Sequence, residues 1–379
     1  MKLIVFGLTV SSAWGNGHAT LWRGLCRAMA QRGHRVVFFE RDVPYYRAHR
    51  DLIELPGGRL VLFEDWNEIR ALAAREVADA DVAMVTSYCP DAQAATELVL
   101  AAPRAKRVFY DLDTPVTLAR LRRGEQVAYI GSGGLGGFDL VLSYTGGSAL
   151  TALRDELGAQ RVAPLYGHVD PAVHRPAALL DRYRADLSYL GTYAADRQDG
   201  VSALFIEPAR GRPDRRFLIG GAQYPPDFPW TPNIHFVHHV VPEEHPAFFS
   251  SSRLTLNVTR SAMAEMGWCP SGRLFEATAC GAAVLSDVWD GLDAFYRPGE
   301  EILIARSAED VRAAMDRSDA EIRRVAEAGR DRTLTEHTAA RRLDTLERIL
   351  AETPGSVPNS LPTCASGSGA RVPELSGEA

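Results

Sequence analysis

Apolar and polar residues alternate in blocks along the first half of the chain. Residues 3–8 form a continuous apolar run, as expected for a strand that is covered on both faces. A glycine-rich loop over residues 11–18 follows, and residues 20–32 then carry apolar side chains at helical spacing up to Gly33. Similar runs predict strands at residues 35–40, 60–63, 81–85, 107–110 and 140–143. Because helical patterns lie between several of them, this order predicts an open parallel sheet with helices on both faces.

The alternation stops near residue 164 and then starts again. The segment PLYGHVDPAVHRP holds three prolines and has no clear period, so residues 164–183 are predicted to form a linker. Residues 310–350 are mostly helical, and further strands are predicted at residues 186–190, 216–219, 234–237, 253–258, 283–286 and 302–304. After residue 352 the sequence becomes rich in Pro, Gly, Ser and Thr and loses any periodic apolar pattern, which predicts a disordered tail.

These patterns divide the 379 residues into two α/β domains. We predict Rossmann-like, doubly wound domains at residues 1–168 and 169–335, a helix at 336–352 that packs back on the first domain, and a disordered tail at 353–379. Ligands of such sheets bind beyond the carboxyl ends of the strands. The two crevices would face a central cleft, in which one domain holds a donor and the other an acceptor.

Composition and charge exclude several classes of protein. With 46% hydrophobic and 24% charged residues, the chain is neither disordered nor fibrous. Its net charge of -6 argues against nucleic-acid binding, and its wealth of arginine and alanine is typical of GC-rich bacterial genes. The five cysteines form no C-x-x-C pair, and no stretch approaches the roughly 18 apolar residues of a membrane span. We therefore expect a cytoplasmic protein.

The segment SGRLFEATACGAAVLSD, residues 271–287, predicts a helix that ends at Gly281 and leads into a strand. The free amides at the start of this helix suit a pyrophosphate, and Arg273 adds a positive charge. Glu276, one turn further, can accept hydrogen bonds from ribose hydroxyls. The alternative is an ordinary amphipathic helix that packs on a sheet. The predicted donor-binding residues of this segment are Ser271, Gly272, Arg273, Leu274 and Glu276.

A glycine-containing turn at residues 191–193 follows the first predicted strand of the second domain. Glycine lets the backbone approach a phosphate closely, although the turn is equally compatible with a simple strand-to-helix connection. Other cleft residues are expected at the end of the strand at 253–258. The predicted donor-binding residues in these two places are Gly191, Thr192, Tyr193, Arg197, Asn257 and Arg260.

The loop Gly15-Asn16-Gly17-His18 follows the first strand and lacks the G-x-G-x-x-G spacing of a nicotinamide site. Its glycines permit a tight turn and the close approach of a ligand. A helix start would lower the pKa of His18 and keep the imidazole neutral, so that it can take a proton from a hydroxyl group in the cleft. A helix cap or a positioning hydrogen-bond donor is the alternative role for His18.

The pair Asp111-x-Asp113 ends an apolar strand and permits several interpretations. Asp113 is our second candidate base, and it is equally placed to cap a helix that has Pro115 in its first turn. A metal site like that of GT-A glycosyltransferases conflicts with the two-domain layout. Four histidines at 235, 238, 239 and 245 also lack the spacing of a metal site, so we predict no metal and no obligatory cofactor.

Several of these segments resemble the CgeB-like glycosyltransferases, a GT-B family named for a spore-maturation protein. The similar segments are SSAWGNGHAT, FFERDVPYY, FYDLDTPVTL, PLYGHVDP and residues 256–305, and the resemblance extends to about residue 350. It implies a GT-B fold in which the first domain binds the acceptor and the second binds the donor, with Glu276 on the ribose and Arg273 on the diphosphate. Retaining GT-B enzymes often carry a glutamate eight positions earlier, where this chain has Trp268 and, nearby, Glu265. The sequence therefore leaves open whether transfer retains or inverts the configuration at the anomeric carbon.

The resemblance predicts transfer of a sugar from a nucleotide-diphosphate sugar to an acceptor hydroxyl, with His18 as the base. The acceptor is a small molecule or a glycan. A nucleotide-sugar epimerase, a phosphorylase on the same fold and a non-catalytic nucleotide-sugar-binding protein remain alternatives. Three arginines of the last helix (Arg341, Arg342 and Arg348) suggest peripheral contact with anionic lipid, or simply a solvated face.

Overall fold

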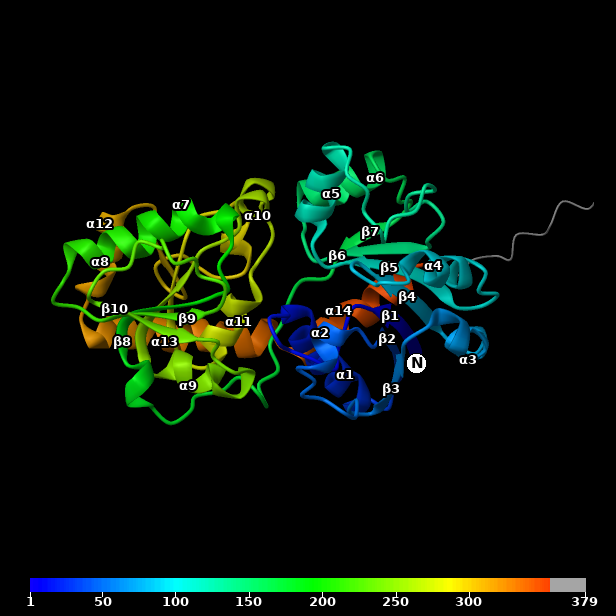
Figure 1. The fold of residues 1–379 in the computed structure, drawn as a ribbon, viewed down its shortest axis with the longest axis horizontal. Helices are drawn as coiled ribbons and strands as arrows, with labels where there is room; N and C mark the ends of the chain where they lie inside the picture. The colour runs from blue at the N-terminus through cyan, green and yellow to red at the C-terminus, as the bar shows by residue number, and fades with distance from the viewer. Residues whose placement is uncertain (355–379) are drawn as a thin grey trace, which may run out of the picture.

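The first of two parallel sheets is built from strands in the order β3-β2-β1-β4-β5-β6-β7, in the computed structural model, which describes residues 1–354 (Figure 1). The strands are β1 (Lys2–Gly7), β2 (Arg35–Arg41), β3 (Gly58–Phe63), β4 (Val82–Thr86), β5 (Lys106–Asp111), β6 (Leu140–Ser143) and β7 (Val162–Pro164). Six of them confirm predicted strands. β7 was not predicted, because it is short and runs into the proline-rich segment. Apart from its first two residues, the predicted tail lies outside the described residues.

Helices cover both faces of this sheet, which explains why its strands are apolar throughout. Ile4 and Phe6 of β1 pack toward α3 (Trp66–Ala78) and α4 (Ala92–Leu100). Leu3 and Val5 point to the opposite face, toward α1 (Gly17–Gln31) and α14 (Ala339–Glu352). Successive side chains of a strand alternate between faces, so a strand without polar positions must be covered twice.

The second sheet repeats the pattern with strands in the order β10-β9-β8-β11-β12-β13. They are β8 (Ala185–Leu190), β9 (Phe217–Gly221), β10 (Ile234–His238), β11 (Ser252–Asn257), β12 (Ala283–Ser286) and β13 (Leu303–Ile304). On one face lie α7 (Gln198–Val201), the π-helix Ser202–Ile206, α8 (Glu207–Gly211) and α12 (Ala308–Met315). On the other lie α9 (His245–Ser250) and α11 (Gly272–Ala279). The two sheets confirm the predicted α/β class with two Rossmann-like domains.

The mostly helical region predicted at residues 310–350 is divided into three helices in the structure. α12 ends before Ser318, whose side chain caps α13 (Asp319–Glu336) and forms a reciprocal capping box with Glu321. α13 in turn ends before Thr338, which caps α14 through the backbone N–H of Arg341. Each break is therefore set by a side chain that satisfies backbone amides at the start of a helix.

Shorter helices complete the architecture at the ends of the strands. The α-helices are α2 (Pro44–Arg47), α5 (Thr114–Arg122), α6 (Ser148–Asp155) and α10 (Ser261–Met266), and the 3-10 helices are at Asp181–Tyr183, Ala195–Arg197, Pro242–Glu244 and Leu292–Ala294. Among residues 1–354, no helix is long and apolar enough to cross a membrane.

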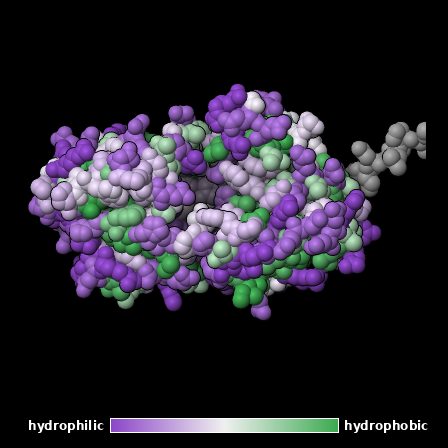
Figure 2. Space-filling view, viewed as in Figure 1, coloured by the Kyte–Doolittle hydropathy of each residue, from purple (hydrophilic) through white to green (hydrophobic). Residues whose placement is uncertain are grey.

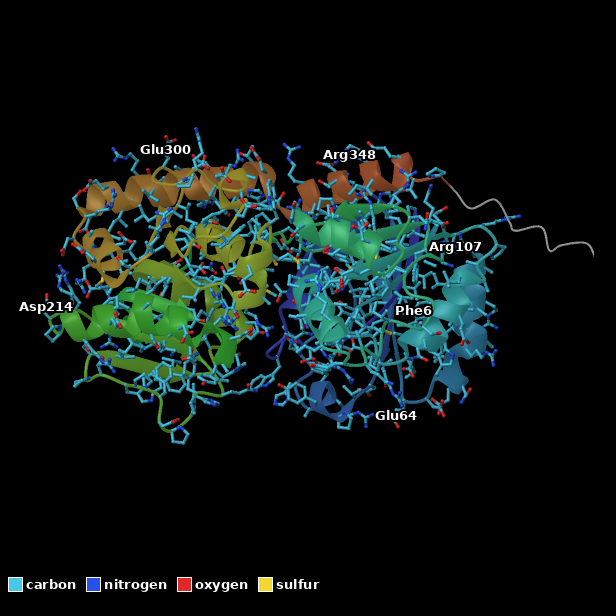
Figure 3. The ribbon with its side chains drawn as sticks, turned by 90° about the horizontal axis from the view of Figure 1, so that it is seen from above. Phe6, Glu64, Arg107, Asp214, Glu300 and Arg348 are labelled. Atoms are coloured by element: carbon cyan, nitrogen blue, oxygen red, sulfur yellow. The ribbon has the colours of Figure 1, made fainter. Side chains whose placement is uncertain are left out.

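The chain crosses between the two domains twice, and the two crossings lie side by side. The Val169 amide donates to the His337 carbonyl at 2.9 Å, and the Ala339 amide donates to the Val169 carbonyl at 2.8 Å. From there α14 runs along the first domain (Figure 3), where Leu343 is fully buried against the core. Arg342 is 7% exposed and donates to the Gly167 carbonyl. It therefore does not belong to a solvated or lipid-facing surface, in contrast to the expectation for the three arginines of this helix.

Candidate functional site

A cavity of about 430 Å³ lies between the two domains, where the carboxyl ends of both sheets meet. Figure 2 shows a hollow between the two halves of the molecule. Residues from both domains line the cavity, including the loop after β1, the end of β5, the turn after β8 and the start of α11. The predicted site residues in its wall are Gly15, Asn16, Gly17, His18, Asp113, Gly191, Thr192, Arg197, Arg260, Ser271, Gly272, Arg273 and Glu276.

A buried carboxylate shapes the loop that carries His18. Glu40, at the end of β2, is 1% exposed and accepts hydrogen bonds from the hydroxyls of Thr9 and Ser11 at 2.7 and 2.6 Å. It also accepts the backbone amides of Val10 and Ser11 at 2.8 and 3.0 Å. Several bonds to one ionised acceptor hold a loop in a single conformation. Glu40 lies in the FFERD segment, but nothing in the sequence indicated that it binds the loop between β1 and α1.

His18 lies in the first turn of α1. Asn16 caps this helix by accepting the His18 amide at 3.0 Å, and Gly15 adopts a φ of 60°, which a side chain would disfavour. The capping role falls to Asn16, which leaves the imidazole of His18 free to line the cavity. Its Nδ1 atom is buried and has no hydrogen-bond partner among the described residues.

The side chains of His18 and Asp113 lie close together in the cavity wall, although they come from different parts of the first domain. The Nε2 atom of His18 lies 3.8 Å from the Oδ2 atom of Asp113, and both side chains are about one-fifth exposed, at 21% and 20%. Burial lowers the pKa of His18, whereas the Asp113 carboxylate raises it. Since burial is the larger effect, the imidazole is neutral near pH 7 and able to accept a proton.

The two aspartates of the D-x-D pair have different surroundings. Asp113 occupies the N-cap position of α5, but its side chain makes no capping hydrogen bond. Asp111 is fully buried, accepts the Asp113 amide and the Thr117 hydroxyl at 3.1 Å each, and does not line the cavity. Burial raises the pKa of Asp111 to about 6. Of the pair, only Asp113 reaches the cavity.

The donor side of the cavity is built on the start of α11. The Ser271 hydroxyl accepts the Arg273 amide at 3.3 Å and caps the helix. Ser271, Gly272 and Arg273 all line the cavity, and Glu276 follows one turn later on the same wall. The free amides and dipole at this end attract negative charge. Leu274, which the sequence also suggested, points into the hydrophobic core and is fully buried.

Two guanidinium groups contact Tyr189. Arg273 lies over the Tyr189 ring, 5.5 Å from its centroid, and donates to the Asn257 side chain at 3.4 Å. Arg197 donates to the Tyr189 hydroxyl and to the Thr192 carbonyl, each at 3.4 Å. Burial, with the Arg197 charge as a smaller cause, lowers the pKa of Arg273. In the described part of the chain the side chains of both arginines donate to uncharged oxygens rather than to carboxylates, so the two guanidinium groups can bind an anion.

Gly191 makes room for these cations. A Cβ atom at this position would lie 2.9 Å from the Tyr189 hydroxyl and 3.3 Å from Nη2 of Arg273. A side chain here would have to displace the Tyr189 hydroxyl and would crowd the guanidinium group. Tyr193 and Asn257 do not line the cavity: Tyr193 packs on Tyr224 with ring centroids 5.9 Å apart, and Asn257 is buried behind Arg273.

The loop that precedes α11 joins the two domains. Trp268 accepts the Gly146 amide at 3.0 Å through its carbonyl, and the Thr145 hydroxyl lies 3.1 Å from the Cys269 sulfur. Neither Trp268 nor Glu265 lines the cavity. On the opposite rim, the ring of Trp14 lies against the ring of His239 of the second domain, with centroids 3.5 Å apart and the planes tilted by 31°. These contacts close the two domains around the site.

The four histidines that the sequence grouped together are separated in the structure. His239 and His245 line the cavity, whereas His235 and His238 do not, and Nε2 of His235 lies 3.1 Å from Nη1 of Arg216. His174, from the linker, was not singled out from the sequence. Its imidazole is 2% exposed and lies close to His245 and Glu276.

Comparison with known proteins supports the interpretation of the fold. Residues 197–348 match the model of a family described as glycosyl transferase-like. Curated protein sequences include none that matches this chain. The match is to a glycosyl transferase-like family and does not identify the CgeB-like type.

Solved structures match both domains. Sucrose-phosphate synthase from Thermosynechococcus elongatus is 16% identical with a TM-score of 0.66, and the match covers 93% of this chain and 100% of that one. Anabaena Alr3699/HepE in complex with UDP-glucose is 12% identical with a TM-score of 0.64, over 93% and 100%. An alpha-glucosyltransferase in complex with UDP and DNA is 12% identical with a TM-score of 0.63, over the same shares. The chain therefore has the two-domain fold of GT-B glycosyltransferases.

Proposed function

We propose that this protein is a glycosyltransferase of the CgeB-like type, which moves a sugar from a nucleotide-diphosphate sugar to an acceptor hydroxyl. One observation carries the proposal: a neutral imidazole paired with a carboxylate faces two arginines and a helix start across a single cavity between two Rossmann-like domains. The imidazole and its carboxylate are suited to take the proton of an acceptor hydroxyl. The two arginines and the helix start are suited to bind a diphosphate.

In this mechanism the donor diphosphate lies against Arg273, Arg197 and the amides at the start of α11. These groups stabilise the negative charge that develops as the bond between the anomeric carbon and the diphosphate oxygen breaks. They do so without a metal ion, because two guanidinium groups supply the positive charge. Glu276 accepts hydrogen bonds from the ribose. Relatives with this fold have been solved with UDP-glucose or UDP, which supports a nucleotide donor.

The acceptor approaches from the first domain. His18 takes the proton of the acceptor hydroxyl while the acceptor oxygen forms the bond to the anomeric carbon, and the nucleoside diphosphate leaves. Asp113 stabilises the imidazolium that results. No carboxylate from residues 265–268 lines the cavity. This arrangement therefore favours direct displacement, with inversion of configuration at the anomeric carbon.

The deciding experiment is release of nucleoside diphosphate from a panel of nucleotide sugars, with and without candidate glycan and small-molecule acceptors. We expect slow hydrolysis of one donor in water and faster turnover with an acceptor. If no nucleotide sugar binds or reacts, the proposal fails. An epimerase would instead convert the sugar without an acceptor, and a non-catalytic binding protein would bind the nucleotide sugar without releasing nucleoside diphosphate.

A further inference from the structure

Three side chains with metal-ligand chemistry converge at the donor end of the cavity. His174 comes from the interdomain linker, His245 from the start of α9 and Glu276 from α11, and each offers a ligand atom within 4.8 Å of the other two. His245 and Glu276 line the cavity, and His174 is 2% exposed behind them. The three residues are far apart in the sequence, so no spacing pattern could reveal the cluster.

The hydrogen bonds of the two imidazoles leave ring nitrogens available. Nε2 of His245 lies 3.2 Å from the Val240 carbonyl oxygen. A carbonyl can only accept, so Nε2 carries the proton and Nδ1 keeps its lone pair. Metal-ligating histidines are commonly oriented in this way by a backbone carbonyl. Nδ1 of His174 is buried and has no hydrogen-bond partner among residues 1–354. A buried polar atom without a partner is costly, and a ligand would remove that cost.

The distances fit a small ion after a modest adjustment. The three ligand atoms lie within 4.8 Å of one another, so a central ion would lie no more than about 2.8 Å from any of them. Zinc binds histidine nitrogen and carboxylate oxygen at about 2.0–2.2 Å, so no ligand atom needs to move by more than roughly 0.7 Å. Small side-chain rotations achieve such a shift. Mg²⁺ fits poorly, because it prefers oxygen ligands, whereas two imidazoles and one carboxylate suit Zn²⁺.

We infer that His174, His245 and Glu276 form a binding site for a divalent transition-metal ion, with Zn²⁺ as the best fit. In the donor-binding mechanism Glu276 also contacts the ribose, so a bound ion and a nucleotide sugar would compete. The ion is therefore an inhibitor of transfer and has no part in the reaction. The metal site stands on its own geometry, whereas the competition rests on the proposed function.

The first experiment measures Zn²⁺ binding to the full chain by calorimetry, together with the visible absorption of bound Co²⁺. We expect one tight ion per chain and tetrahedral Co²⁺ absorption. His174→Gln, His245→Ala and Glu276→Gln should each weaken binding by about tenfold or more, whereas the matched control His235→Ala should not. Glu276→Gln keeps the size of the side chain, so it remains informative if a histidine variant folds poorly. Absence of tight binding, or equal affinity in all variants, overturns the metal site.

A second experiment separates the ion from the donor. Zn²⁺ should raise the KM for the nucleotide sugar without lowering kcat, and His174→Gln should abolish this effect. If Zn²⁺ binds to the cluster but leaves the KM unchanged, the predicted competition between the ion and the nucleotide sugar is wrong, whereas the metal site is supported. If no nucleotide sugar reacts but Zn²⁺ still binds, only the proposed function fails.

Discussion

The Nε2 atom of His18 lies 3.8 Å from the Oδ2 atom of Asp113, although the two residues follow different strands, β1 and β5. β1 and β5 both pair with β4, so their carboxyl ends lie at the same edge of the sheet. At this separation the carboxylate stabilises a charged imidazole while burial opposes it. Burial keeps the resting imidazole neutral, and the carboxylate offsets part of the cost of charging His18 when it takes a proton from a substrate, which suits a general base.

Replacing His18 should remove the base. We expect His18→Asn to lower kcat by about 10²–10⁴-fold, the usual contribution of a positioned general base. The change should leave the thermal transition close to that of the parent, because the imidazole makes no hydrogen bond through Nδ1. Steady-state kinetics with the identified donor test this, with His235→Asn as the control. Unchanged kcat in His18→Asn would exclude the base role.

The pH dependence of the parent enzyme follows from the lowered pKa of His18. Only the neutral imidazole accepts a proton, so kcat/KM should be constant near neutral pH and fall as the pH drops through a value below 6.5. Asp113 raises this pKa, so Asp113→Asn should move the acidic limb to still lower pH and reduce kcat. A shift of the limb to higher pH in Asp113→Asn would contradict the pairing.

Removing a guanidinium group should weaken donor binding. A hydrogen bond to a charged group contributes about 1.5–3 kcal/mol, so Arg273→Met should raise the donor KM by roughly 10–150-fold. The same substitution at the exposed Arg324 is the matched control. Titration of the binding of the nucleoside diphosphate checks the result independently of catalysis. If Arg273→Met and Arg324→Met bind the nucleoside diphosphate with equal affinity, Arg273 does not contribute to donor binding.

The buried Glu40 should control the loop that carries His18. In Glu40→Gln, one carboxylate oxygen is replaced by an NH₂ group, which cannot accept a hydrogen bond. One or more of the backbone and hydroxyl donors therefore loses its acceptor. Each unsatisfied buried donor costs about 1–3 kcal/mol, and we expect a decrease of that size in the free energy of unfolding, measured with urea. kcat should fall as the loop loosens. Glu64→Gln, at an exposed position with a side chain 71% exposed, should change neither quantity.

Much of the fold could be predicted because the strands are covered on both faces. A continuous apolar run such as residues 3–8 then predicts a buried strand. The helices between such runs are predicted by the helical spacing of their apolar residues. β7 escaped prediction because three residues next to proline carry no pattern. The division of the C-terminal helical region depends on caps at Ser318 and Thr338, which are single residues inside an otherwise helical pattern.

The candidate site was partly predictable for the same reason. Loops after parallel strands gather at one edge, so His18, Asp113 and Gly191 were expected to face a cleft. Leu274 was misleading because its place in a motif gave no information about which side of the helix faces the core. Glu40 and His174 were missed because their roles depend on partners that are distant in the chain.

The sequence by itself determined the class of fold, the two α/β domains and several of the loops that line the cavity, because apolar periodicity and glycine turns are local properties. Only the tertiary structure decided which side chains meet: His18 with Asp113, Arg273 and Arg197 with Tyr189, and His174 with His245 and Glu276. Such pairs depend on strand order and on the closure of two domains. Contacts between distant residues are set by packing of the whole chain, so no local pattern specifies them.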